Sequence, residues 1–290
     1  MSLTTNAEQA KIVISRLQSA FAKREGLLQE VGDLVENQIP EGVQPLSRDH
    51  ALFLFYTVAN DHGMKSSRLY ARSKELFKLR RYLFDPHKVL KKYRAPDDPE
   101  LLEDTGKFLG TRYPKETAKG WFRNSEKLEK QYAGDPRKLF REFPDAQALI
   151  KEIKEFRGYG PKTGGLLLRA VVGLGFAAPS NVEKVLVPVD IHDSRISFFT
   201  GVVKSDDCEQ PSSADYYSYV PDIQKILRDT CSALGFDWLD VDRALWIIGS
   251  RGCVKQRCSL CPLQDVCKVG IKVTQSKLPS TQTGSQPNLF

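Results

Sequence analysis

The chain has 290 residues, and its 43 Lys and Arg outnumber its 36 Asp and Glu, so the formal net charge is +7. Hydrophobic residues make up 41% of the sequence and aromatic residues 10%, which excludes disordered and collagen-like chains and suffices for one large or two modest domains. The longest apolar runs, such as 52–56 and 244–248, are far shorter than the about 20 residues of a membrane-spanning helix. We therefore expect a globular protein that does not enter a membrane.

The start of the chain has no features of a secretory signal. Residues 1–10 are polar, and the next segment mixes charged with apolar residues. We expect an intracellular protein, in the cytoplasm and nucleoid or in a nucleus. The positive net charge favours an acidic partner such as nucleic acid, although charge alone does not establish one.

Apolar residues recur at intervals of three and four along much of the chain, which predicts a mainly helical protein. The expected helices cover residues 9–38, 47–58, 69–79, 119–132 and 146–155. Prolines and a glycine between 86 and 106 indicate loops with short helices. The valine-rich run 184–189 is strand-like, and the polar composition from 275 to 290 predicts disorder.

A glycine-rich turn follows the helix predicted at 146–155. Gly158 and Gly160 permit a tight turn, and Pro161 suits the first turn of a following helix. Backbone N–H groups at such a turn bind a phosphate without reading the base sequence. The two glycines alone favour a simple turn between packed helices, so the interpretation depends on a second segment.

That second segment is Val-Pro-Val-Asp-Ile-His-Asp-Ser-Arg at 187–195, which brings a carboxylate to the start of a helix. Together with Gly-Tyr-Gly-Pro-Lys-Thr at 158–163, it resembles the endonuclease III superfamily of helix-hairpin-helix DNA glycosylases. The resemblance implies that Lys162 attacks the deoxyribose C1′ and forms a Schiff base, assisted by Asp190. A deprotonated lysine is a nucleophile, and an aspartate can accept its proton or stabilise positive charge on the sugar.

The site departs from the family pattern in its spacing. Lys162 and Asp190 are 28 positions apart (190 − 162), which is longer than in typical members, and Asp193 is an alternative carboxylate. His192 is expected to have a structural role. Thr163 joins Gly158 and Gly160 as a predicted DNA-binding residue of the turn.

Four of the six cysteines form the pattern Cys-x4-Cys-x2-Cys-x5-Cys at Cys253, Cys258, Cys261 and Cys267. Four thiolates in one short loop can surround a metal centre. Zinc is the alternative, but zinc ribbons use two separated Cys-x2-Cys pairs and this loop has one. The family loop, Cys-x6-Cys-x2-Cys-x5-Cys, binds a 4Fe-4S cluster, so the resemblance implies such a cluster on a loop with a shortened first gap. The other two cysteines, at 208 and 231, are expected to be ordinary thiols.

Further residues are candidates for contact with DNA. Arg251, Lys255 and Arg257 lie in or beside the cysteine loop, where they either meet phosphates or remain solvated charges. Residues 121–127 resemble the stretch of the family in which an apolar side chain wedges into the duplex. Phe122 is the candidate wedge, and the alternative is that it belongs to the core.

The resemblance implies an all-α fold with two helical domains flanking a DNA-binding groove. We expect residues 1–44 to form an N-terminal helix that packs with the C-terminal cluster domain. Residues 45–175 are expected to form a six-helix barrel with the helix-hairpin-helix, and residues 176–270 the aspartate segment and iron–sulfur domain. Residues 271–290 are expected to be a disordered tail.

The implied function is that of a monomeric, bifunctional DNA glycosylase and AP lyase of base excision repair. Its partner is double-stranded DNA with a damaged or mismatched base, and an oxidised pyrimidine is the first substrate expected. The turn at 60–63 lacks the glutamine usual in the family, which leaves the substrate open. The alternatives are a monofunctional mismatch or 8-oxoguanine glycosylase and a non-catalytic helix-hairpin-helix DNA-binding protein.

Overall fold

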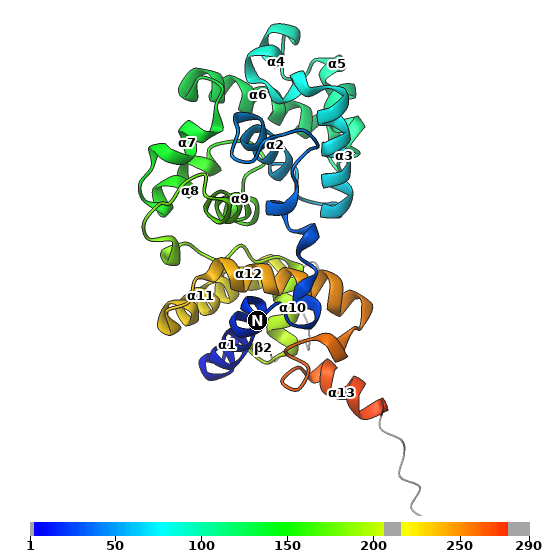
Figure 1. The fold of residues 1–290 in the computed structure, drawn as a ribbon, viewed down its shortest axis with the longest axis vertical. Helices are drawn as coiled ribbons and strands as arrows, with labels where there is room; N and C mark the ends of the chain where they lie inside the picture. The colour runs from blue at the N-terminus through cyan, green and yellow to red at the C-terminus, as the bar shows by residue number, and fades with distance from the viewer. Residues whose placement is uncertain (1–2, 206–215, 278–290) are drawn as a thin grey trace, which may run out of the picture.

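The structure is a computed structural model that describes residues 3–205 and 216–277. Figure 1 shows two groups of helices, with α2–α9 in a first domain and α1 and α10–α13 in a second. The α-helices are α1 (Ala7–Ala22), α2 (Arg48–Val58), α3 (Ser66–Leu79), α4 (Pro86–Lys92), α5 (Pro99–Leu102), α6 (Pro114–Tyr132), α7 (Pro136–Glu142), α8 (Ala146–Lys154), α9 (Pro161–Leu174), α10 (Ile191–Phe199), α11 (Tyr216–Leu234), α12 (Trp238–Ile247) and α13 (Lys268–Lys277).

Short helical turns and one pair of strands complete the described residues. The turns are η1 (Gly26–Gln29), η2 (Val31–Asp33), η3 (Val35–Asn37), η4 (Arg81–Phe84), η5 (Glu103–Lys107), η6 (Val182–Lys184), η7 (Ile248–Gly252), η8 (Cys253–Lys255) and η9 (Cys258–Leu260). Strands β1 (Leu3–Thr5) and β2 (Val203–Ser205) pair antiparallel. The all-α fold class predicted from the sequence is confirmed. Among the described helices, none combines the length and apolarity that crossing a membrane requires.

Helix α2 is the centre of the first domain. It is apolar on all sides, and every residue from His50 to Val58 is buried, as expected for a helix surrounded by others. The Tyr56 ring stacks on Trp121 of α6 at 4.6 Å between centroids. The Trp121 indole N–H donates a hydrogen bond to the Leu83 carbonyl at 2.7 Å, so α6 and the η4 turn are both held against α2.

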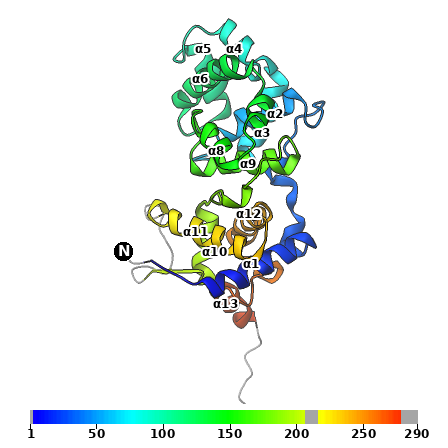
Figure 2. The same cartoon turned by 90° about the vertical axis from the view of Figure 1, so that its left-hand side faces the viewer.

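The N-terminal segment starts in the second domain and crosses to the first (Figures 1 and 2). Helix α1 packs on α11 and α12. The prediction of one helix over 9–38 is wrong, because α1 ends at Ala22 and the η1–η3 turns follow. Arg24 and Gly26 both adopt left-handed backbone angles, which a continuous helix does not allow. A Cβ atom at position 26 would lie 2.3 Å from the Leu260 carbonyl oxygen, so the linker passes close to the cysteine loop.

The valine-rich run does not form a strand. Val185, Val187 and Val189 are buried, while Leu186 between them is 40% exposed. The Gln224 side chain of α11 donates a hydrogen bond to the Val187 carbonyl at 2.8 Å. The run is therefore an extended connection that carries the chain from α9 to the second domain and ends at the start of α10.

The end of the chain also differs from the prediction. Helix α13 spans Lys268–Lys277, so residues 271–277 are helical and not disordered as expected. Residues 278–290 of the predicted tail lie outside the described residues, as does the cysteine at position 208.

Candidate active site and cysteine loop

Helices α8 and α9 form the predicted hairpin. Gly158 has φ +86°, and a Cβ atom there would lie 2.2 Å from the Ala59 carbonyl oxygen, so this position requires glycine. The Thr163 hydroxyl donates to the Gly158 carbonyl and accepts from the Gly160 N–H, both at 2.8 Å. Thr163 is 4% exposed, and its side chain and the Gly160 N–H are engaged within the hairpin. Contact of the hairpin with a phosphate stays a prediction.

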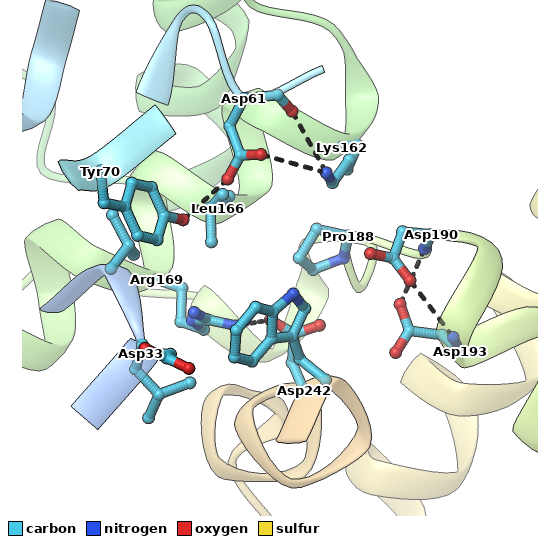
Figure 3. Close-up of a pocket in the computed structure, with 13 residues that line it drawn as sticks. Asp33, Asp61, Tyr70, Lys162, Leu166, Arg169, Pro188, Asp190, Asp193 and Asp242 are labelled. Atoms are coloured by element: carbon cyan, nitrogen blue, oxygen red, sulfur yellow. Dashed lines mark hydrogen bonds and ion pairs between the residues drawn. The ribbon is translucent and has the colours of Figure 1, made fainter. Parts of the chain in front are cut away.

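Lys162 stands in the first turn of α9 with its side chain 33% exposed. Its ammonium group donates a hydrogen bond to the Asp61 backbone oxygen at 3.2 Å and lies 3.8 Å from Asp61 Oδ1. Figure 3 shows the Lys162 side chain turned towards Asp61. The turn between α2 and α3 therefore supplies the nearest negative charge to the predicted nucleophile.

Asp61 was not identified from the sequence. Its side chain is 2% exposed, and it accepts hydrogen bonds from the Ser66 hydroxyl at 2.8 Å and from the Tyr70 hydroxyl at 2.7 Å. Asp61 and Lys162 are 101 positions apart. The sequence shows 60–63 as a polar turn that lacks the family's usual glutamine, and this pattern does not reveal which distant helix the turn contacts.

Asp190 caps the N-terminus of α10. Its Oδ1 accepts hydrogen bonds from the backbone N–H groups of His192 at 2.7 Å and Asp193 at 3.3 Å. In return, the Asp193 carboxylate accepts from the Asp190 N–H at 2.7 Å. This reciprocal arrangement is a capping box. Asp190 is half-buried whereas Asp193 is 2% exposed, so Asp190 is the more accessible of the two carboxylates.

Lys162 and Asp190 line one small cavity, although these two described residues do not form an ion pair with each other. Its volume is about 20 Å³, enough for about one water molecule and smaller than a nucleobase. The lining comes from the turn after α2, from α3, α9, α10 and α12, and from the linker before α2. The cavity therefore lies where the two domains and their linker meet (Figure 3).

A buried charge cluster borders this cavity. The Arg169 guanidinium of α9 lies 2.8 Å from Glu36 of the linker and 2.5 Å from Asp242 of α12. Arg243 also contacts Glu36, at 3.0 Å. Burial raises the pKa of Asp242 to about 6 even though Arg169 opposes this change. Arg169 thus links the first domain to both the linker and the second domain.

Phe122 does not lie where a DNA wedge must lie. It is 6% exposed in the core of the first domain, because it belongs to the buried face of α6. Tyr113, just before the same helix, is 51% exposed. The neighbouring Arg112 approaches Gly63, where a Cβ atom would lie 3.0 Å from the arginine side chain. Arg112, which precedes the exposed aromatic residue, therefore contacts the turn that holds Asp61.

The four clustered cysteines, Cys253, Cys258, Cys261 and Cys267, line a single cavity of about 40 Å³. Burial and the neighbouring thiols raise the pKa of Cys253 to about 11 and that of Cys261 to about 12. Within 3–205 and 216–277, no three His, Cys, Asp or Glu side chains converge as a single metal ion requires. Four cysteines on one cavity supply the four thiolates that hold a 4Fe-4S cluster, and they also match the ligand number of a structural zinc site.

The other described cysteine, Cys231, is not part of this loop. It is 2% exposed in α11, and burial raises the pKa of its thiol to about 12. It is an unreactive thiol of the core.

Two of the three predicted basic contacts are neutralised within the protein. Arg251 forms an ion pair with Asp33, and Arg257 lies 2.6 Å from Glu30. Both pairs tie the cysteine loop to the linker and compensate the charge of these two arginines, whose contact with phosphates stays a prediction. Lys255 is exposed and stays a candidate for DNA contact.

Comparison with known proteins relates this architecture to solved structures of endonuclease III and of a thymine-DNA glycosylase. No family model and no curated protein sequence matches the chain. Among solved structures, a trapped covalent intermediate of endonuclease III with DNA, described as an estranged-adenine complex, is 17% identical with a TM-score of 0.57, covering 93% of this chain and 100% of that chain.

Two further solved structures agree with the first. A non-covalent endonuclease III–DNA complex is also 17% identical, with a TM-score of 0.56, covering 94% of this chain and 100% of that chain. A thermostable thymine-DNA glycosylase is 12% identical with a TM-score of 0.52, covering 91% of this chain and 98% of that chain. The chain therefore has the fold of the endonuclease III-like helix-hairpin-helix DNA glycosylases.

Proposed function

We propose that the protein is a DNA glycosylase and AP lyase that removes a damaged base from double-stranded DNA. The observation that carries this proposal is the placement of a lysine amine and an aspartate on one cavity between two domains of a glycosylase fold. The hairpin of α8 and α9 lies beside Lys162, so a DNA backbone bound at the hairpin would bring its sugars towards this amine.

The chemistry follows from these two side chains. After Lys162 loses a proton, its Nζ attacks C1′, and the base departs with the electron pair of the glycosidic bond. The Asp190 carboxylate stabilises positive charge on the sugar as this bond breaks. The C1′–O4′ bond of the resulting aminal then breaks, O4′ takes up a proton as the sugar ring opens, and a protonated Schiff base forms between Nζ and C1′. This Schiff base acidifies the C2′ protons, and loss of one of them expels the 3′ phosphate by β-elimination. Lys162 is released when water hydrolyses the Schiff base.

The substrate base must leave the DNA stack to reach this site. C1′ of a stacked nucleotide is inaccessible, and a damaged or mispaired base costs less to unstack. Because the cavity beside Lys162 holds only about 20 Å³, the domains or side chains must move apart when DNA binds. Tyr113 replaces Phe122 as the side chain proposed to fill the gap in the duplex, since it is exposed.

We propose a 4Fe-4S cluster as the group held by Cys253, Cys258, Cys261 and Cys267, with zinc as the alternative. The cluster would neutralise the mutual repulsion of the thiolates and hold the loop in one conformation. An oxidised pyrimidine is the first substrate proposed, and a mismatched base or 8-oxoguanine follows. The protein is proposed to act as an intracellular monomer.

The test uses duplex oligonucleotides that each carry one lesion, with incision and borohydride trapping as readouts. Wild-type protein should cut one lesion class and become covalently trapped on it. Lys162→Gln should abolish trapping, whereas Lys151→Gln, which alters an exposed lysine of α8, should not. Asp190→Asn should slow base release by about 10²-fold or more while DNA binding persists. Undiminished trapping by Lys162→Gln would overturn the assignment of the nucleophile.

A monofunctional glycosylase is the second candidate, because Lys162 is paired with a buried carboxylate and a protonated lysine is not a nucleophile. In that enzyme, Asp190 would activate water to attack C1′. Base release without trapping or strand cleavage would identify this mechanism.

A further inference from the structure

We propose that Asp61 is a positioning residue, which anchors Lys162 as an ammonium ion in the DNA-free protein and must release it before the lysine attacks DNA. This inference rests on the function proposed above. It concerns Asp61 in the turn between α2 and α3, a residue to which the sequence analysis assigns no role.

Asp61 holds the ammonium group at two points. The backbone oxygen accepts its hydrogen bond at 3.2 Å, and the carboxylate oxygen Oδ1 lies 3.8 Å away. Two contacts from one residue restrict both the position and the direction of the lysine side chain. The amine nitrogen therefore faces the first domain, while Asp190 stands across the cavity in Figure 3.

The Asp61 carboxylate is itself held in place. It is 2% exposed, and the hydroxyl groups of Ser66 and Tyr70 donate to its two oxygens at 2.8 Å and 2.7 Å. Donors that remain neutral stabilise a carboxylate as an anion. Burial and the charge of Asp61 raise the pKa of Tyr70 far above its ordinary value, so Tyr70 stays a neutral donor.

Other charged groups also face Lys162. They are Asp190, Asp193 and His192 at the start of α10, Asp242 of α12, Arg169 of α9 and His62 of the α2–α3 turn. Burial lowers the pKa of Lys162, but Asp61 first and the other three aspartates next more than offset burial and raise it. Burial lowers the pKa of both histidines, so neither adds a positive charge at neutral pH. Among these described groups, Asp61 is the one that forms an ion pair with Lys162.

Lys162 must lose a proton before it attacks C1′. Nζ must give up one proton to water or hydroxide to expose its lone pair, and the Asp61 charge opposes that loss. Removing this charge while keeping the shape of the side chain should free the amine at lower pH. The Asp61→Asn variant makes this change.

The first readout is the rate of borohydride trapping on a duplex with one abasic site, which isolates the lysine step from base recognition. In wild-type protein, the rate should rise with pH as Lys162 deprotonates. In Asp61→Asn, the midpoint of this rise should move down by about one pH unit or more, equivalent to about tenfold more free amine on the rising limb. Asp97→Asn, an exposed position, makes the same change in net charge and should leave the midpoint in place.

The second readout does not require DNA. Lysine amines are labelled by reductive ¹³C-methylation and titrated by NMR, and the Lys162 signal is the one missing from Lys162→Arg. The Lys162 midpoint should fall in Asp61→Asn, and an unchanged midpoint overturns the inference. If the midpoint falls but wild-type protein is never trapped on DNA, the role of Asp61 stands and the lyase proposal fails. Should Asp61→Asn not fold, the wild-type titration decides, because a Lys162 midpoint no higher than that of exposed Lys151 overturns the inference.

Discussion

The Lys162 site and the cysteine loop are both clusters of reactive side chains, but they are assembled in opposite ways. The cysteine loop takes its four thiols from 15 consecutive residues (267 − 253 + 1). The Lys162 site takes its charges from the α2–α3 turn, from α9, α10 and α12, and from the linker before α2. The first cluster depends on local chain geometry and the second on the packing of two domains.

The two clusters also differ in how their charges are balanced. Around Lys162, lysine and arginine side chains form ion pairs with aspartates and a glutamate, so opposite charges face each other in this cluster. The clustered thiols have like charges when ionised, and burial and their neighbours raise the pKa of Cys253 and Cys261. A site in which opposite charges are paired can remain folded when empty, whereas a bound cation would favour the thiolate forms of Cys253 and Cys261.

Substitution of a cysteine should have the largest effect. Cys261→Ser should abolish the broad visible absorbance of an iron–sulfur protein and unfold the loop locally, because structural metal binding contributes about 10 kcal/mol or more in zinc sites that fold on binding. Absorbance, iron and sulfide analysis, and limited proteolysis measure these changes. Cys231→Ser, outside the loop, should retain the absorbance. Zinc in the wild-type protein, without iron, would contradict the cluster assignment.

Substitution of Arg169 tests the cluster that depends on the packing of the two domains. Arg169→Met should lower the free energy of unfolding by about 3–5 kcal/mol, because it leaves Glu36 and Asp242 buried without their partner. Urea denaturation measures the loss. Arg228→Met removes a more exposed arginine, whose side chain is 30% accessible, and should cost less than about 1 kcal/mol. Equal losses of unfolding free energy in both variants would show that the buried ion pairs of Arg169 stabilise the protein no more than the exposed ion pair of Arg228.

A buried histidine of the first domain should make this region sensitive to acid. Burial lowers the pKa of His50 from 6.5 to about 4, so the unfolded chain binds this proton first as pH falls. The contribution of neutral His50 to the free energy of unfolding is therefore fully present above pH 6.5. It is lost progressively as the pH falls from 6.5 to about 4, and the total loss is about 3 kcal/mol. The difference in unfolding free energy between wild type and His50→Gln, measured across this range, isolates the contribution. If this difference in unfolding free energy does not change with pH, His50 does not cause the sensitivity to acid.

The smallest expected effect concerns the basic side chains of the cysteine loop. Lys255 is exposed, whereas Arg257 is paired with Glu30. If Lys255 contacts one phosphate, Lys255→Ser should reduce the slope of log affinity against log salt by about 0.9. Arg257→Ser should change the slope less, because its charge is already compensated. DNA titrations at several salt concentrations measure the slope for each variant. A larger change of slope in Arg257→Ser than in Lys255→Ser would contradict the ion pair between Arg257 and Glu30 as the reason for the difference.

Local patterns in the sequence predict the position of several helices of this protein. Hydrophobic periodicity identified α2 and α8 to within a few residues, because one periodic segment folds as one helix. The same periodicity failed at 9–38, where Arg24 and Gly26 take left-handed angles and the linker passes the cysteine loop. It also did not distinguish Phe122 as a core residue from an exposed wedge, since burial depends on what a helix packs against.

The sequence by itself determined the helical class, the glycine turn before Lys162, the aspartate at the start of α10 and the spacing of four cysteines. Each of these is encoded by neighbouring residues, whose chemistry acts over a few positions. Only the tertiary structure decided that Asp61 pairs with Lys162, that Glu36 and Asp242 pair with Arg169, and that Arg251 and Arg257 are neutralised. The physical reason is that an ion pair requires only proximity in space, and distant segments acquire that proximity when the domains pack.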